Sequence, residues 1–474
     1  MRRALPWLAA GGVLLGALVG GGVLWSVISA DEADGADDPR ERKRILSVVD
    51  DPVPPSATAA SGAPNVVLII GCTFRRDQTS VYTPELADTT PYLASLAREG
   101  VVLDDLVNAA PWTKAASTAI VTGHHAVTLG MVEDGANRNA KVLPDEVVTV
   151  AEAFRAAGYR TFGVTTNPNV HSRMGFAQGF DHYGEPAQLW REHMAKAPGR
   201  VAVHQALEWV GGAGDTPFYL QVLLVDAHAP FPKEPMATDQ GVPELVGRYR
   251  AGLTKLDREI ERLVEGLREA GHGDDTVVVV VNDHGEGLEW PTHHGKGHGR
   301  YLTPSAVGGV GVFWGVGLPA GRRVPGLASQ VDLAPTLLSL AGISGWEGPG
   351  YDLAPALRGQ AAGTPRTEAY ADTWFRKSQR TARYTEGQAC QLNFNKADVV
   401  DRHGHRFDEG CFDRRADPDH REASRDGSGE RAIVAWRSAQ LAAASARGDV
   451  GSVEVDDDLD RQLEALGYAE GDEE

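Results

Sequence analysis

The chain has 474 residues, of which 42% are hydrophobic and 23% are charged. These fractions are ordinary for a globular protein, and the length suffices for one large domain with appendages or for two or three small ones. The 46 basic and 65 acidic residues give a net charge of −19, which argues against broad nucleic-acid binding.

The N-terminus has the pattern of a membrane segment. Arg2 and Arg3 precede a mostly apolar, uncharged stretch at 4–30, and acidic residues begin at Asp31. A stretch of this length can cross a bilayer, and the positive charges before it favour a cytoplasmic N-terminus with the rest exported. We predict a transmembrane anchor or signal sequence at 1–30 and a flexible linker at 31–63. The protein is then anchored in a bacterial inner membrane and periplasmic, or secreted if the segment is cleaved.

From residue 64 strand-like and helix-like segments alternate. Five apolar runs are predicted strands: Val66–Ile70, Arg160–Thr165, Phe218–Val225, Thr276–Val281 and Val310–Phe313. Four amphipathic stretches are predicted helices: Thr90–Arg98, Glu146–Ala157, Val201–Val210 and Leu245–Ala270. The alternation favours an α/β fold with a largely parallel sheet and helices on both faces.

The pattern changes from about Tyr370, where segments become short, polar and rich in Arg and Asp. This predicts a small C-terminal subdomain that ends in a helix within 459–468. Cys390 and Cys411 lie near one another in the sequence, and an exported compartment permits a disulfide between them. Cys72 would then be the odd thiol.

Three of the predicted strands end in groups able to do chemistry. The first runs into Cys72 and Thr73, another ends at Asp226 and His228, and a third ends at Asp283 and His284. Such groups at neighbouring strand ends can converge on a metal; Asp and His together suit Zn²⁺ or Mn²⁺, whereas all-oxygen sets suit Ca²⁺. The alternative is that each Asp or His caps a following helix or turn.

Two further stretches carry candidate groups. In "APWTKAASTAIVTG", Thr113 precedes a short helix predicted over Lys114–Val121. Thr113 is either the N-cap of this helix or a nucleophile at a helix N-terminus that favours a bound anion. The glycine-rich loop "WPTHHGKGHGRY" contains His294, Lys296 and His298. Its histidines could supply a metal ligand and its lysine an anion-binding cation; the alternative is an exposed, pH-sensitive loop.

Taken in order, these stretches resemble the sulfatase family of the alkaline phosphatase superfamily, in a bacterial branch with divergent active-site motifs. The resemblance extends from Pro64 to Tyr468 and rests on "PNVVLIIGCTFRRDQTSVY", "APWTKAASTAIVTG", "DAHAPF", "VVVNDHGEG", "GHGRYL" and "SQVDLAPTLLSLAGI". It implies an alkaline-phosphatase-like α/β/α sandwich at 64–369 with a central mixed sheet, and a small sheet and helix at 370–474. It also implies a divalent metal and attack on a sulfate or phosphate ester.

The sequence departs from the family pattern at two places. The family's opening metal loop carries Asp-Asp or Asp-Thr, where this chain has Cys72-Thr73. A thiolate is a good ligand for Zn²⁺ and a poor one for Ca²⁺ or Mg²⁺. Cys72 therefore indicates a site for a softer metal, a weakened or empty metal site, or a reactive thiol. The family's sulfatases form their nucleophile, a formylglycine hydrate, from the Cys or Ser of a C/S-x-P-x-R motif. This chain has Thr113 at that position and lacks the Pro and Arg, so the resemblance leaves a Thr alkoxide as the candidate nucleophile.

The main hypothesis is an exported, metal-dependent hydrolase or transferase of sulfate or phosphate esters. Its predicted catalytic residues are Thr113, Lys114 and His228. Its predicted metal ligands are Cys72, Asp226, Asp283, His284 and His298, with Zn²⁺ or Mn²⁺ favoured if Cys72 is a ligand and Ca²⁺ possible by resemblance. Its predicted substrate contacts are Thr73, His294 and Lys296. The alternative is a catalytically degenerate relative that binds an anionic glycan or lipid, or scaffolds partners.

Overall fold

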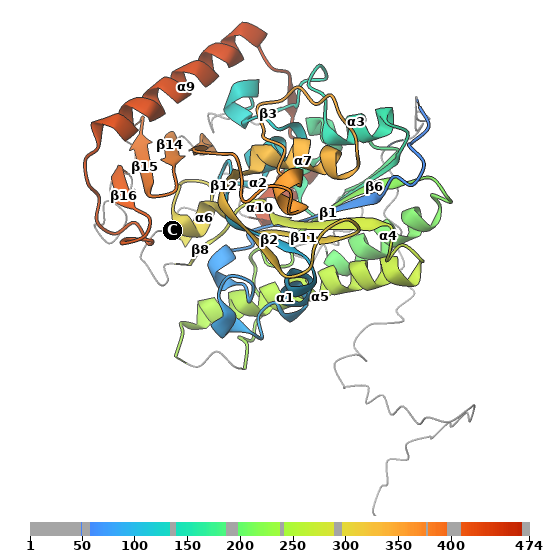
Figure 1. The fold of residues 1–474 in the computed structure, drawn as a ribbon. Helices are drawn as coiled ribbons and strands as arrows, with labels where there is room; N and C mark the ends of the chain where they lie inside the picture. Colours follow the sequence, from blue (N-terminus) through green and yellow to red (C-terminus); the bar gives the residue numbers. More distant parts are fainter. Residues whose placement is uncertain are drawn as a thin grey trace, which may run out of the picture. The chain divides into compact units, whose positions relative to one another are not determined.

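A mixed sheet of nine strands forms the centre of the fold (Figure 1). A computed structural model of the protein describes residues 49, 57–132, 139–185, 198–237, 241–288, 296–375, 378–395 and 409–466, all within the unit Arg44–Glu474. In spatial order the sheet contains β10 (Gly308–Gly309), β2 (Val101–Val107), β11 (Gly311–Gly315), β7 (Thr276–Asn282), β1 (Asn65–Gly71), β6 (Phe218–Leu224), β4 (Arg160–Thr165) and β5 (His182–Gly184). The last strand, β12 (Arg322–Ser329), pairs with β2.

The central strands β7, β1, β6, β4 and β5 run parallel, whereas β11 runs antiparallel to both β7 and β2. Residues of β1, β6 and β7 are buried along their whole length. Strands covered on both faces need apolar side chains at every position, which explains the continuous apolar runs in these segments.

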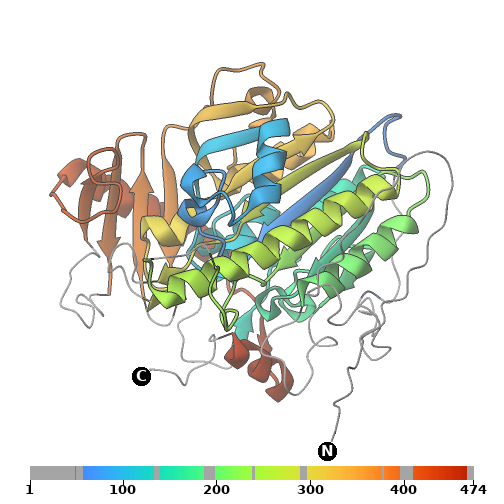
Figure 2. The same ribbon diagram turned by 90° about the horizontal axis from the view of Figure 1, so that it is seen from below.

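Helices cover both faces of the sheet. The face turned to the viewer in Figure 2 carries α1 (Pro91–Glu99), α4 (Gly199–Gly211) and α5 (Glu244–Glu269). The opposite face carries α2 (Thr113–Thr122), α3 (Val150–Ala156), α7 (Leu333–Leu340), α8 (Ala354–Leu357) and α10 (Asp457–Ala465). Since side chains of a strand alternate between faces, Val67 packs on the α5 side and Leu68 on the α2 side.

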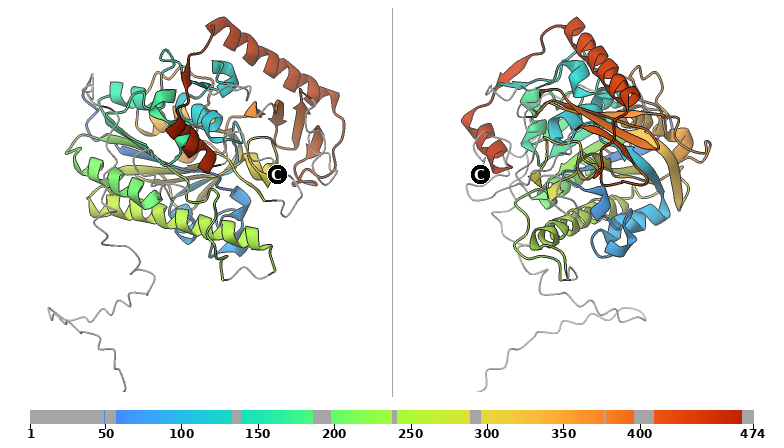
Figure 3. Two further views of the ribbon diagram at one scale, coloured as in Figure 1. Left: turned by 180° about the vertical axis from the view of Figure 1, so that it is seen from behind. Right: turned by 90° about the vertical axis from the view of Figure 1, so that its left-hand side faces the viewer.

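A second, four-stranded antiparallel sheet follows near the C-terminus. It contains β13 (Ala369–Thr373), β14 (Arg380–Tyr384), β15 (Gln388–Asn393) and β16 (Gly410–Asp413), and α9 (Gly427–Arg447) packs on it (Figure 3). The remaining short elements are α6 (Pro304–Val307) and the pairs β3 (Asn139–Lys141) with β17 (Ser452–Glu454) and β8 (Gly287–Leu288) with β9 (Lys296–Gly297). The predicted boundary at 369/370 falls at the start of β13, and the division into domains stays a prediction.

The structure confirms the predicted α/β/α sandwich, its mixed central sheet and the small C-terminal sheet. Each of the five predicted strands and four predicted helices overlaps an observed element, but β2, β12 and α9 were not predicted. The anchor predicted at 1–30 and most of the linker at 31–63 lie outside the described residues. Within the described ranges no helix has the length and apolar character needed to cross a bilayer.

The structure also contains the disulfide between Cys390 and Cys411, which pair directly across β15 and β16. Replacing both residues by serine opens a closed loop with a sequence separation of 21. We expect a loss of about 3 kcal/mol in the stability of the small sheet and a lower melting temperature, measured by differential scanning fluorimetry. Dithiothreitol should lower the melting temperature of the unmodified protein in the same way and leave the double variant unchanged. Equal melting temperatures for all samples would contradict this expectation.

Candidate active site

The candidate site lies at the edge where the parallel strands end. β1 and β7 end in register, with Gly71 opposite Asn282, so Cys72 and Asp283 each follow a strand end directly. The backbone N–H of Cys72 donates to the carbonyl of Leu224 in β6 (2.8 Å). β4 ends beside β6. The carboxyl ends of parallel strands share one edge, so this topology gathers the polar residues of four loops.

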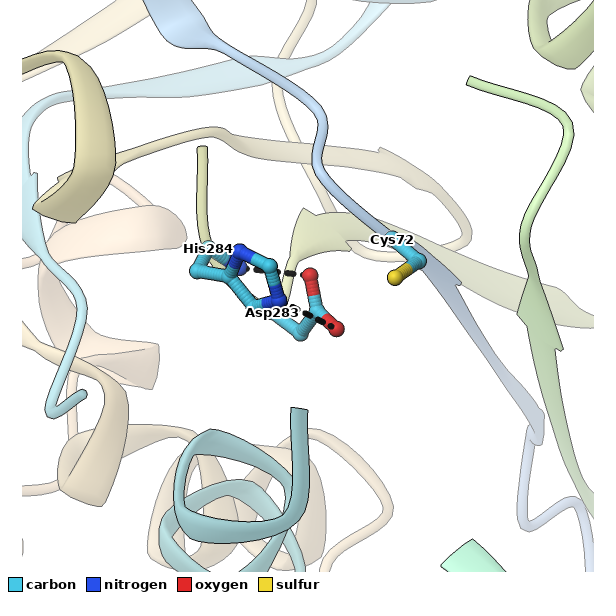
Figure 4. Close-up of side chains that lie close together, drawn as sticks. All are labelled: Cys72, Asp283 and His284. Carbon is cyan, nitrogen blue, oxygen red and sulfur yellow. Dashed lines mark hydrogen bonds and ion pairs between the residues drawn. The ribbon is translucent and has the colours of Figure 1, made fainter. Parts of the chain in front are cut away.

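Cys72, Asp283 and His284 form a buried group whose side chains point toward one another (Figure 4). Their potential ligand atoms all lie within 4.8 Å of one another, and Asp283 Oδ2 is 3.5 Å from His284 Nε2. Asp283 Oδ1 accepts from the backbone N–H of Thr73 (3.1 Å) and of His284 (2.6 Å). Among the described residues Asp283 Oδ2 has no hydrogen-bond donor. A buried carboxylate oxygen in this state fits a cation.

The tautomer of His284 follows from its backbone contact. His284 Nδ1 lies 2.7 Å from the carbonyl oxygen of Gly285, and because a carbonyl only accepts, Nδ1 carries the proton. Nε2 then keeps its lone pair and faces Asp283 and Thr113. Burial lowers the pKa of His284, and the Asp283 carboxylate only partly offsets this effect. A neutral imidazole fixed by a carbonyl is the form in which histidine binds metals.

Thr113 is the first residue of α2, and its hydroxyl faces the group formed by Cys72, Asp283 and His284. Trp112 occupies the N-cap position, so the alternative that Thr113 caps this helix does not hold. Thr113 Oγ1 lies 3.3 Å from His284 Nε2 and 3.6 Å from Cys72 Sγ. Thr113 is fully buried. Its hydroxyl therefore lies in a site shielded from water.

The Cys72 thiol sits in surroundings that disfavour its charged form. Burial raises the pKa of Cys72 well above its ordinary value, and the negative charge of Asp283 adds to the effect. A reactive thiolate requires positive surroundings and partial exposure, so the reactive-thiol alternative finds no support.

Two histidines and one glutamate continue the site beyond His284. The ring of His298 lies 4.6 Å from that of His284 and 5.0 Å from that of His228, measured between centroids. His298 Nδ1 is 3.3 Å from Glu286 Oε2. Burial by itself would raise the pKa of Glu286, but the neighbouring histidines, foremost His298, bring it below its usual value. His228 Nδ1 donates to the carbonyl of Ala229 (2.7 Å).

Comparison with known proteins identifies the family. The sulfatase family model matches residues 64–343, which is more than half of the chain. The chain belongs to the sulfatase family. This family is part of the alkaline phosphatase-like superfamily, as the sequence predicts.

Relatives support the same conclusion. N-acetylgalactosamine-6-sulfatase of Canis lupus familiaris is 24% identical over 361 residues, 64% of this chain and 67% of that enzyme. The sulfotransferase Agl7 of low-salt glycan biosynthesis in Haloferax volcanii is 34% identical over 138 residues, 27% of this chain and 34% of Agl7. A protein solved with its substrate D-glucosamine-2-N,6-O-disulfate has a TM-score of 0.63 at 15% identity, covering 81% of this chain and 99% of that chain. Membership in the sulfatase family supports sulfuric ester hydrolase activity.

The structure does not bring every predicted site residue of this sulfatase-family chain together. Asp226 points to the sheet face covered by α4 and α5, whereas Cys72 packs on the α2 face. Asp226 Oδ1 accepts from the backbone N–H of Gly199 at the start of α4 (3.3 Å). Asp226 is therefore placed apart from His228 and His298. Within the described ranges the other candidate ligand set is Cys390, Cys411 and Asp426, whose cysteines form the disulfide.

The predicted anion-binding groups also differ in their placement. The Thr73 hydroxyl donates to the carbonyl of Cys72 (2.7 Å), so only its backbone N–H faces the site, and its φ of 54° is unusual for a β-branched residue. Lys114 is buried in the first turn of α2. Lys296 lies in β9, but its side chain and the whole of His294 fall outside the described part of the chain.

Sequence reasoning missed four residues that build or support the site. Glu286 follows His284 in the "NDHGEG" motif, and Asn167 follows β4, a fourth strand with a polar end. Tyr249 in α5 donates its hydroxyl to the carbonyl of Thr73 (2.6 Å) and so fixes the metal loop. Gln330, within the "SQVDLAPT" motif, donates to the carbonyl of Asp283 (2.6 Å). The motifs gave a signal for Glu286 and Gln330, whereas the role of Tyr249 requires the packing of α5.

Proposed function

We propose that this sulfatase-family protein hydrolyses sulfuric esters with Thr113 as nucleophile and Cys72, Asp283 and His284 as ligands of Zn²⁺. The single observation that carries the proposal is the placement of Thr113 Oγ1. It lies 3.3 Å from His284 Nε2 and 3.6 Å from Cys72 Sγ, beside the open oxygen of Asp283. A nucleophile directly beside a candidate metal group is the arrangement that ester cleavage requires.

The donor set favours Zn²⁺ over Ca²⁺. Zn²⁺ binds sulfur at about 2.3 Å and nitrogen or oxygen at about 2.0 Å in a tetrahedron, so its ligand atoms lie roughly 3.3–3.6 Å apart. The separation between two of the proposed ligand atoms, Asp283 Oδ2 and His284 Nε2 (3.5 Å), falls in this range. Thr113 Oγ1, the proposed nucleophile, lies at similar distances from His284 Nε2 (3.3 Å) and Cys72 Sγ (3.6 Å). Ca²⁺ takes oxygen ligands only and more of them.

A bound divalent cation would supply positive charge that stabilises the charge developing during attack on the ester. The chain supplies the remaining groups. The N-terminus of α2, which carries Thr113, favours the anionic sulfo group. Thr113 Oγ1 gives its proton to water and bonds to sulfur while the bond from sulfur to the alcohol oxygen breaks. His228, protonated on both ring nitrogens, donates the Nε2 proton to the leaving alcohol and regains one from water. Water then hydrolyses the sulfo-threonine, which releases sulfate and restores the Thr113 hydroxyl.

We further propose that the protein acts outside the cytoplasm, anchored by its N-terminal segment. The support is the uncharged stretch at 4–30 behind Arg2 and Arg3, together with the disulfide between Cys390 and Cys411. Structural disulfides form and persist in oxidising compartments such as the bacterial periplasm.

The alternative of a degenerate, non-catalytic relative has one observation in its favour. Burial and Asp283 raise the pKa of Cys72, as expected for a neutral thiol that fills the space of a lost carboxylate. Such a protein would bind an anionic glycan or lipid, or scaffold partners, without turnover. Metal content separates the two functions, because the degenerate form needs none.

Metal removal tests the proposed function. We expect protein purified without chelator to contain about one equivalent of Zn²⁺ and to cleave 4-nitrophenyl sulfate, with 4-nitrophenyl phosphate as a second substrate. Dialysis against a chelator should abolish turnover, and added Zn²⁺ should restore it. Metal content is measured by inductively coupled plasma mass spectrometry. A chain that purifies metal-free, does not bind added Zn²⁺ and cleaves neither ester would establish the degenerate alternative.

A further inference from the structure

Asn167 contacts both the proposed nucleophile, Thr113, and a proposed metal ligand, Cys72. It lies just after β4 and is fully buried. Its Nδ2 atom is 3.1 Å from Thr113 Oγ1 and 3.4 Å from Cys72 Sγ. A side-chain amide nitrogen carries two hydrogens and no lone pair for accepting, so it can donate to both atoms at once.

The orientation of this amide is fixed by its other end. Asn167 Oδ1 accepts from the backbone N–H of Asn169 (2.9 Å) and from Asn169 Nδ2 (3.1 Å). A backbone N–H only donates, so the atom facing it must be the oxygen, and Nδ2 must therefore face Thr113 and Cys72. Turning the amide over would place the Asn167 NH₂ group against the two donors of Asn169, its backbone N–H and its Nδ2.

The loop that carries Asn167 is itself held to the sheet. The backbone N–H of Asn167 donates to Thr165 Oγ1 (3.0 Å) at the end of β4. Thr166 bonds to β6 through its backbone N–H, which donates to the carbonyl of Leu223 (2.9 Å). Asn167 thus stands on the rigid strands that also place Cys72, and its position does not depend on a ligand.

The consequence for Thr113 concerns the direction of its hydroxyl. Because Thr113 Oγ1 accepts from Asn167 Nδ2, this contact holds the oxygen on the side of the site where His284 Nε2 lies 3.3 Å away.

We infer that Asn167 is a positioning residue that holds Thr113 Oγ1 and Cys72 Sγ in their metal-facing orientation. The inference rests on the proposed function, because it assigns to Asn167 the support of a metal-bound thiolate and of a threonine nucleophile. Outer-shell partners of metal ligands commonly change metal affinity or activity by about 10- to 100-fold when they are removed.

The test uses the full chain with the substitution Asn167→Ala and Co²⁺ as a spectroscopic probe. We expect Co²⁺ affinity, measured by competition with a chromophoric chelator, to fall by about 10- to 100-fold, with a weaker thiolate-to-cobalt absorption band. With 4-nitrophenyl sulfate, kcat should fall by a similar factor while KM changes little, because Asn167 acts on Thr113 and not on the substrate. Melting temperatures establish that each variant is folded.

Val170→Ala is the matched control, since Val170 is buried in the same loop and its side chain has no hydrogen-bonding group that could hold Asn167. It should leave the cobalt band and kcat close to those of the unmodified protein. If Asn167→Ala binds Co²⁺ as tightly as the unmodified protein and keeps its kcat, the role of Asn167 is overturned and the proposed function stands. If the unmodified protein itself shows no thiolate-to-cobalt band, both are overturned.

Discussion

Replacing Thr113 by alanine is expected to reduce ester turnover by about 1,000-fold or more, because the variant lacks the oxygen that would bond to sulfur. Metal content should change much less, since Cys72, Asp283 and His284 keep their side chains. The measurement is the rate of 4-nitrophenol release from the sulfate and phosphate esters at saturating Zn²⁺. Turnover that survives this substitution at the original rate would exclude Thr113 as the nucleophile.

Two further variants separate lost chemistry from a disturbed helix. Thr113→Ser keeps a hydroxyl in the same place and should retain measurable turnover. Thr118→Val serves as the matched control, because Thr118 is as fully buried as Thr113 and lies in the same helix. Its hydroxyl donates to the carbonyl of Lys114 (2.8 Å) and to Met131 Sδ (3.7 Å), and neither atom belongs to the group formed by Cys72, Asp283 and His284. Its turnover should equal that of the unmodified protein.

The second large effect is expected from Cys72→Asp, which restores a carboxylate at the opening metal loop. Zn²⁺ affinity should fall and Mn²⁺, Mg²⁺ or Ca²⁺ affinity should rise, because an oxygen replaces the soft sulfur donor. We expect a change of about 10-fold or more in the ratio of Zn²⁺ to Mn²⁺ affinity, with one equivalent bound in either case. Isothermal titration with each metal after chelator treatment provides the measurement.

Cys72→Ser is the companion variant, because it removes the sulfur without adding charge. It should lose Zn²⁺ affinity and gain nothing for the harder ions. A Cys72→Asp variant that takes up metal where the unmodified protein takes up none would favour the degenerate alternative. If neither metal content nor turnover responds to either substitution, Cys72 does not contribute to a metal site.

The strand ends were predictable because their signals are local. Val66–Ile70 and Thr276–Val281 are apolar at every position, so the sequence itself marks strands buried on both faces and the polar residues that follow them. The structure brings Cys72 and Asp283 together because β1 and β7 are parallel neighbours in register. The disulfide was likewise suggested by short spacing and is present.

The remaining features depend on packing that a single sequence does not reveal. Asp226 ends an apolar run as Asp283 does, but strand alternation turns it to the α4 face, where it meets the backbone of Gly199. Predicting this requires the exact register of β6 and the layer on each face. Asn167 lies in an ordinary polar turn, and only the order of strands β1, β6 and β4 places it beside Cys72.

The order of the strands in the sheet also bears on when a metal can enter. Contacts that assemble the site join residues 95, 171 and 210 positions apart in the chain: Asn167 with Cys72, Thr113 with His284, and Thr73 with Asp283. Such distant pairings need most of the chain to be present, and β7 must join β1 before Asp283 reaches the others. A growing or unfolded chain therefore offers no assembled set of ligands. The compartment in which the polypeptide completes its sheet decides which pool of metal ions it samples.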